Sequence, residues 1–272
     1  MDRRVRDELT ALHTRIAPRF ARPEVRARVE CYLVGLLEEV GRRNGWQMAE
    51  QIGDNRPDGV QRLLNKARWD AELIRDDLRN YVVERMGHPD GVLVITEAGF
   101  PKKGVKSVGV AQQFNPSTSR VENCQVGVFL AYASVRGMAF IDRALYLPQE
   151  WAEDDARRRG AGVPGGVRYV TNGELARSML ERAFEAGVHP RWVADSGFCG
   201  EYEELRERLE EKGHSYTLAV SSSHTLWKRI GGAPSWETAE PPYIRDSRPW
   251  KRVKADANGE WVDSREWVRH TH

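Results

Sequence analysis

Two acidic side chains in this chain accompany apolar, strand-like runs, where carboxylates can hold a metal ion. Glu97 follows the run Val92–Ile95, and Asp195 follows Trp192–Ala194 much later in the chain. A glycine comes two residues after each acid, which predicts a turn directly after each strand. Carboxylates on rigid elements can hold Mg²⁺ or Mn²⁺ ions roughly 3.5–4 Å apart for hydrolysis of phosphate esters. Glu97 and Asp195 are therefore candidate catalytic and metal-binding residues.

The same acids have a simpler interpretation. Acids at strand ends often serve as helix caps or as solvent-facing turn residues, and Asp195 taken alone fits that role equally well.

The basic residues also have two interpretations. Lys102, Lys103 and Lys106 form a basic turn after the first strand and could contact a DNA phosphate, although a solvated turn would have the same composition. The run Arg157–Arg159 is more typical of an exposed surface.

Composition limits the class of protein. The chain has 272 residues, of which 40% are hydrophobic and 30% are charged, a composition typical of a globular protein. Its net charge is only +2, so the overall charge does not indicate a nucleic-acid-binding protein. No run of about eighteen apolar residues is present, so no membrane span is expected. The N-terminus is amphipathic and lacks an apolar signal core. The cysteines are few and scattered, which fits a reducing cytoplasm.

The periodicity of apolar residues predicts two kinds of structure along the chain. From about residue 3 to residue 88 they recur at helical spacing, and Asp70 is a good N-cap, so 1–88 is expected to be an all-helical domain. Strands are then expected over 92–95, 106–114, 124–132, 138–147, 191–195 and 215–220, with helices near 173–186 and 201–212.

That element order predicts an α/β fold over 89–230, an RNase H-like mixed sheet flanked by helices. In this fold the first and fourth strands of the sheet lie side by side, which would bring Glu97 and Asp195 together. Another α/β fold with the same element order is the alternative. The tail over 231–272 has β-like pieces at most and is interpreted as the start of an incomplete insertion segment.

Several motifs resemble those of DDE-type insertion-sequence transposases. They are Asn44–Glu50, Gln61–Leu64, Trp69-Asp70, Gly99–Gly104, Ser107–Val110, Glu122–Val126, Asp142-Arg143, Leu145–Pro148 and Trp192–Asp195. The resemblance runs from about residue 25 to the C-terminus. It implies a catalytic core with Mg²⁺ or Mn²⁺, bound to the ends of a mobile element and to target DNA. The implied reaction is DNA cleavage followed by attack of the freed 3′-hydroxyl on the target. The helical domain would contact DNA or another subunit, such as the second copy in a homodimer.

This chain departs from the family pattern in two places. The family usually has Asp followed by Asp or Glu before Thr-Gly-Phe, where this chain reads Thr96-Glu97-Ala98-Gly99-Phe100. Successive strand residues point to opposite faces, so Thr96 and Glu97 cannot both face the metals. If position 97 is the ligand, a carboxylate survives; if position 96 is the ligand, a charge is lost. The sequence leaves this choice open.

The second departure concerns the third acid of the family, a glutamate on a helix beyond the last core strand. The chain ends at His272, which the resemblance places within the insertion that precedes that helix. These departures lead to the expectation of a C-terminally truncated transposase with impaired catalysis. The alternative is a catalytically inactive DNA-binding or regulatory protein of transposase origin. A third possibility is small-molecule chemistry in a closed pocket at Glu97 and Asp195.

Overall fold

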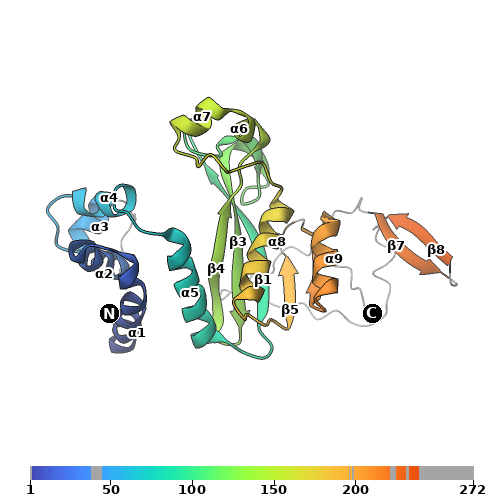
Figure 1. Ribbon diagram of the computed structural model, residues 1–272, viewed down its shortest axis with the longest axis horizontal. Coiled ribbons are helices and arrows are strands. Elements are labelled where there is room, and N and C mark those ends of the chain that lie inside the picture. The colour runs from blue at the N-terminus through green and yellow to red at the C-terminus, as the bar shows by residue number, and fades with distance from the viewer. Residues whose placement is uncertain are drawn as a thin grey trace. The chain divides into compact units, whose positions relative to one another are not determined.

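The chain divides into two units, Met1–Arg85 and Met86–His272, in the computed structural model of Figure 1. The structure describes residues 2–37, 45–195, 197, 199–220, 225–230 and 233–238, the last two ranges by their backbone alone. Each unit has a hydrophobic core of its own.

The described part of the first unit is built from helices, as the spacing of its apolar residues predicts. They are α1 (Arg3–Ile16), α2 (Pro23–Leu37), α3 (Gly45–Gln51), α4 (Asp58–Asn65) and α5 (Ala71–Met86). Asp70 caps α5 as predicted, because its Oδ1 accepts the backbone N–H groups of Glu72 and Leu73. The main core of this unit consists of four buried side chains, Ile16, Phe20, Val29 and Leu63.

Among the described residues, six strands of the second unit form one mixed sheet. They are β1 (Val92–Pro101), β2 (Ala111–Asn115), β3 (Arg120–Ser134), β4 (Gly137–Leu145), β5 (Trp192–Asp195) and β6 (Ser215–Thr217). β3 is antiparallel to β1, β2 and β4, whereas β5 is parallel to β1 and to β6. The order β4-β3-β1-β5-β6, with β2 beside the first residues of β3, confirms the predicted RNase H-like fold.

The long strand β3 determines where β1 ends. It pairs with β1 all the way from Val92 to Pro101, so Glu97 lies inside β1. The turn expected directly after Glu97 does not form, and that expectation is wrong. The parallel neighbour β5 does end early, at Asp195 opposite Ile95.

The strand expected over 106–114 begins only at Ala111. Gly109 has a positive φ of 74°, and the N–H of Val110 donates to the carbonyl of Ser107 across 3.1 Å, which closes a turn before the strand. A side chain at position 109 would also meet the carbonyl of Tyr146, because a Cβ there would lie 2.7 Å from that oxygen. The turn therefore requires glycine.

The α-helices in the described part of the second unit are α6 (Gln149–Glu153), α7 (Asp155–Gly160), α8 (Asn172–Glu185) and α9 (Glu203–Glu211). Helix α8 crosses one face of the sheet and contacts β3 and β4 (Figure 1). Its start is fixed by a capping box, in which Thr171 Oγ1 accepts the N–H of Glu174 and Glu174 Oε2 accepts the N–H of Thr171. This box holds Asn172 in the first turn of α8.

The remaining described strands, β7 (Thr225–Ile230) and β8 (Ala233–Thr238), pair as an antiparallel hairpin. Most of the tail interpreted as an incomplete segment, residues 239–272, lies outside the described residues. No described helix combines the length and the apolar character that crossing a membrane requires.

The position of Gly99 in β1 gives a test of this packing. A Cβ at Gly99 would lie 1.8 Å from Oδ1 of Asn115, whose fully buried amide also donates to Glu122 across 2.7 Å. We expect Gly99→Ala to lower the free energy of unfolding by roughly 1–3 kcal/mol, because the buried amide must shift. Urea unfolding followed by circular dichroism measures the change.

The matched control is Gly104→Ala in the following turn. Among the described residues, no atom lies within 4 Å of a Cβ built at Gly104, so this change should stay within about 0.5 kcal/mol. Equal unfolding curves for the two variants would contradict the packing described for Gly99.

Candidate functional site

The pairing of β1 with β5 decides which side chain of β1 faces Asp195. Ile95 lies opposite Asp195 in the parallel register, and directly paired residues point to the same face of a sheet. Alternation then places Glu97 on that face and Thr96 on the other, where Thr96 pairs with Phe129 of β3. The structure thus brings Glu97 and Asp195 to one face of the sheet and turns Thr96 away from them.

Gly197 lies beside both carboxylates. Its N–H donates to Asp195 Oδ1 across 2.8 Å. A Cβ built at Gly197 would lie 3.4 Å from Asp195 Oδ1 and 3.9 Å from Glu97 Oε2. Both acids therefore border the same small space, which a side chain at position 197 would fill.

Asp195 is almost fully enclosed, with 1% of its surface exposed. Besides the bond to Gly197, its Oδ2 accepts the N–H of Cys199 across 2.8 Å. Burial raises the pKa of Asp195, and the backbone N–H groups of Gly197 and Cys199 partly oppose this effect. The same burial, together with the charge of Asp195, raises the pKa of the Cys199 thiol, so Cys199 stays protonated.

Glu97 has a different partner, on α8. Its Oε1 accepts a hydrogen bond of 2.7 Å from Nδ2 of Asn172. Burial raises the pKa of Glu97; the hydrogen bond from Asn172 opposes this shift, and the like charge of Asp195 adds to it. The pair is therefore costly to ionise fully, and a cation between the two acids would offset that cost.

Two tyrosines lie within electrostatic reach of Glu97. Burial is the largest cause of the raised pKa of Tyr146 and of Tyr202, and the charge of Glu97 raises both further. Tyr146 also hydrogen-bonds to Tyr169, whose ring meets it edge-on with centroids 6.3 Å apart. The ring of Tyr202 lies against Gly173 of α8, where a Cβ would come 2.2 Å from its Cγ. Tyr146 and Tyr202 thus lie close enough to Glu97 for its charge to act on them, and Tyr202 packs on the start of α8.

The donor set fits a hard divalent cation. Two carboxylates that share one space and repel each other are the oxygen ligands that Mg²⁺ and Mn²⁺ prefer. Within the described part of the chain, no group of three or more His, Cys, Asp or Glu residues is placed to hold a metal ion. The acidic ligands that the described residues offer a cation at this site are therefore two, Glu97 and Asp195.

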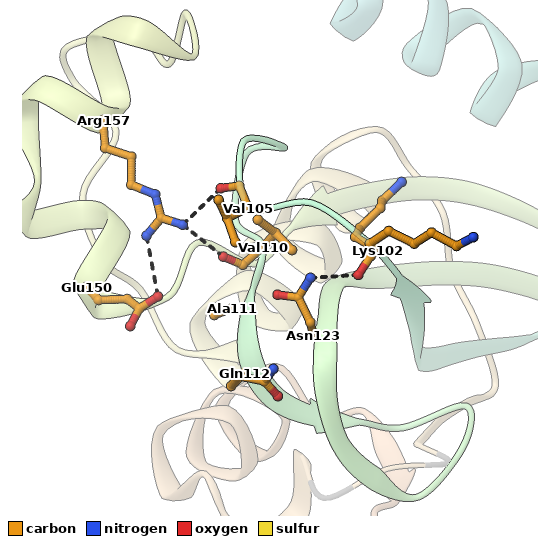
Figure 2. Close-up of a pocket in the computed structure, with 9 residues that line it drawn as sticks. Lys102, Val105, Val110, Ala111, Gln112, Asn123, Glu150 and Arg157 are labelled. Atoms are coloured by element: carbon orange, nitrogen blue, oxygen red, sulfur yellow. Dashed lines mark hydrogen bonds and ion pairs between the residues drawn. The ribbon is translucent and has the colours of Figure 1, made fainter.

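The basic turn after β1 borders a separate cavity of about 470 Å³ (Figure 2). Lys102 and Lys103 line it together with Asn123 and Arg157, whereas Lys106 is not part of the lining. The lining includes neither of the two acids. Lys102 and Lys103 therefore line a cavity that is separate from the space bordered by Glu97 and Asp195.

Arg157 has a structural role that differs from the exposed surface expected of its run. Its guanidinium stacks on the Trp151 ring at 3.8 Å from the centroid. The same group donates to the carbonyls of Val105 and Val110 at 3.2 and 3.3 Å and pairs with Glu150 at 3.5 Å (Figure 2). Arg157 thus joins α6 and α7 to the turn before β2.

Three features of the site were not predicted from the sequence. They are the hydrogen bond from Asn172, the position of Gly197 beside both acids, and the nearby tyrosines. The turn containing Gly197 was visible beside Asp195, but nothing in its pattern pointed to Glu97. Asn172 lies 75 residues from Glu97 in the chain. The local sequence indicates only that Asn172 begins a helix, because it follows Thr171, the first residue of a capping box.

Comparison with known proteins places these residues in a family context. Residues 15–272 match the family model described as "DDE superfamily endonuclease". A curated relative from Microchaete diplosiphon, named "Probable transposase for insertion sequence element IS701", is 24% identical over 233 residues, which cover 80% of this chain. The match covers 58% of that relative, so the chain spans little more than half of its length.

Solved structures match as well, among them two Mos1 complexes. The structure titled "Crystal structure of the Mos1 Strand Transfer Complex" is 15% identical, with a TM-score of 0.25, over 70% of this chain and 56% of its own. The one titled "Crystal structure of a pre-cleavage Mos1 transpososome" is 14% identical, with the same TM-score, over 70% of this chain and 58% of its own.

The raised pKa of Glu97 predicts a pH-dependent effect on stability. Folding favours the protonated acid, so the cost of ionising Glu97 is absent below its unfolded pKa and complete above its folded pKa. In EDTA, Glu97→Gln should therefore stabilise the protein at about pH 8, by roughly 0.5–2 kcal/mol. The gain should shrink as the pH falls towards about 4, near the ordinary pKa of glutamate. Thermal unfolding of both proteins across this range measures it.

Exposed Glu185 at the end of α8 provides the control, since Glu185→Gln removes a carboxylate that is not buried. Its effect should be small at every pH. A Glu97→Gln variant whose stability relative to the parent does not change with pH would argue against a half-buried acid at position 97 that is costly to ionise.

Proposed function

The chain belongs to the DDE superfamily endonucleases, and we propose that it binds DNA and cleaves a phosphodiester bond with divalent metal held by Glu97 and Asp195. The observation that carries the proposal is the carboxylate pair itself. Glu97 and Asp195 lie on adjacent parallel strands, face the same way and border the same space beside Gly197. Asp195 is buried and Glu97 is half-buried. Two like charges so close together and so poorly solvated are unfavourable unless a cation binds between them.

Each residue of the site has a role in this proposal. A bound Mg²⁺ or Mn²⁺ supplies an activated water and stabilises charge on the leaving oxygen. Glu97 and Asp195 hold the cation, and the N–H groups of Gly197 and Cys199 fix the orientation of the Asp195 carboxylate. Asn172 orients Glu97. The buried setting strengthens each of these electrostatic interactions.

The proposal extends to the steps and partners that family membership suggests. Hydrolysis would free a 3′-hydroxyl at the end of a mobile element, and that hydroxyl would attack target DNA. Glu97 serves as the first acid, since Thr96 faces away. We propose reduced activity because the described residues bring two acids, and no third, to the metal site. The helical unit would contact DNA or a second copy of the chain. Light scattering with and without DNA tests the homodimer.

A second candidate function is DNA binding without cleavage. One observation favours it: Asp195 is 1% exposed and both of its oxygens already accept backbone N–H groups. A carboxylate with two oxygens has roughly four acceptor positions, so these bonds leave room for a cation. They also provide a stable arrangement that needs no cation. Measurement of cleavage decides between the two candidates.

The cleavage proposal predicts a defined pattern among three variants. On supercoiled plasmid carrying the DNA that flanks the chain's own coding sequence, we expect Mn²⁺-dependent nicking. Glu97→Ala and Asp195→Ala should each reduce its rate by more than the roughly 10–100-fold typical of residues that only support metal ligands. Gel analysis of nicked and linear products gives the rates.

Thr96→Ala is the matched control, because Thr96 neighbours Glu97 but faces the other side of the sheet. It should keep most of the parent activity. If all of these proteins bind the DNA and none cleaves it with Mn²⁺, DNA binding without cleavage is the correct function. If Thr96→Ala is as inactive as Glu97→Ala, the assignment of Glu97 as the ligand is wrong.

We propose that Lys102, Lys103 and Lys106 contact DNA phosphates, supported by their position in the turn after β1, the strand that carries Glu97. The double variant Lys102→Glu and Lys103→Glu should weaken DNA binding and lower the slope of log affinity against log salt by about 0.9 for each phosphate that is no longer neutralised. Fluorescence anisotropy at several salt concentrations measures both. Exposed Lys212 after α9 is the control, and Lys212→Glu should leave the slope unchanged.

A further inference from the structure

The amide of Asn172 has one partnered end and one unpartnered end. Its Nδ2 donates to Glu97 Oε1 across 2.7 Å. Its Oδ1 is buried and accepts no hydrogen bond from any described residue. Buried polar atoms nearly always have a partner, because leaving one unpaired is unfavourable. This oxygen belongs to the same amide that holds Glu97, so it lies at the border of the acid pair.

The chemistry of this oxygen suits the ion proposed for the site. Amide carbonyl oxygens are neutral, hard ligands and commonly accompany carboxylates around divalent cations. Glu97 and Asp195 already supply two negative charges, which balance a divalent ion. A neutral third oxygen adds a ligand without adding repulsion between acids.

The start of α8 holds this oxygen in place. The capping box of Thr171 and Glu174 fixes the first turn of the helix, to which Asn172 belongs. Tyr202 packs against the adjacent Gly173, so the backbone here has little freedom to move. A ligand supplied from such a rigid turn is preorganised.

We propose that Oδ1 of Asn172 is a third oxygen ligand of the divalent cation at Glu97 and Asp195. The inference rests on the proposed function, because it concerns the same ion. It assigns Asn172 two roles at once: Nδ2 positions Glu97, and Oδ1 binds the metal. The site would then combine two charged ligands from the sheet with one neutral ligand from the helix that crosses it.

Mn²⁺ binding by three variants separates these roles without any measurement of activity. Free Mn²⁺ is followed by electron paramagnetic resonance during titration of the purified chain. Asn172→Ala, which removes both roles, should bind Mn²⁺ about tenfold more weakly than the parent. Asn172→Asp keeps an oxygen ligand and loses the N–H donor, and it should bind at least as tightly as the parent. Asn80→Ala, at an exposed position on α5, should match the parent.

Each outcome has a distinct meaning. If Asn172→Asp binds Mn²⁺ as weakly as Asn172→Ala, Asn172 only positions Glu97, and the ligand assignment is overturned. If Asn172→Ala binds as tightly as the parent while Asp195→Ala does not bind, Asn172 has no part in the site, but the proposed function stands. If the parent shows no Mn²⁺ binding that depends on Glu97 and Asp195, both proposals fail. Circular dichroism and melting temperature of each variant establish that it is folded.

Discussion

The parallel pairing of β1 with β5 is the constraint on which the site depends. Four residue pairs, from Val92 with Trp192 to Ile95 with Asp195, join segments that are far apart in the chain. Leu93 and Val193 are fully buried in this pairing, which ties the register to the core. A slip of one residue would turn every side chain to the opposite face. The register therefore selects Glu97, and not Thr96, as the neighbour of Asp195.

The site that this pairing creates is costly for the protein without a ligand. A buried acid, Asp195, and a half-buried one, Glu97, border the same space, and the pKa of each is raised. Backbone N–H groups at Asp195 and the amide of Asn172 offset part of the cost. Residues that favour stability alone would not be arranged this way, and such local conflicts concentrate at functional sites. A divalent cation is the counterpart that such a pair of acids favours.

Local patterns in the sequence predict the elements, but not the contacts between them. The apolar run Val92–Ile95 and the order of strands and helices were sufficient for the fold. These patterns did not decide whether Thr96 or Glu97 faces the metal site, because that depends on the register between strands that are distant in the chain. The contact of Asn172 with Glu97 could not be predicted either, because it joins two elements that are 75 residues apart in the chain. The strand expected from residue 106 failed for a local reason, since Gly109 takes a positive φ and closes a turn before β2.

The geometry of β1 also relates the acid pair to the basic turn. Four strand steps separate Glu97 from Pro101, the last residue of β1, which corresponds to about 13 Å at roughly 3.3 Å per residue. Phosphates on one strand of duplex DNA advance about 3.4 Å along the axis per nucleotide. A DNA duplex whose axis ran parallel to β1 would thus bring a phosphate about four nucleotides from the cleaved bond to the end of β1, next to Lys102. Arg157 is committed to Trp151 and to backbone carbonyls, so the positive charge available at the adjoining cavity comes from Lys102 and Lys103.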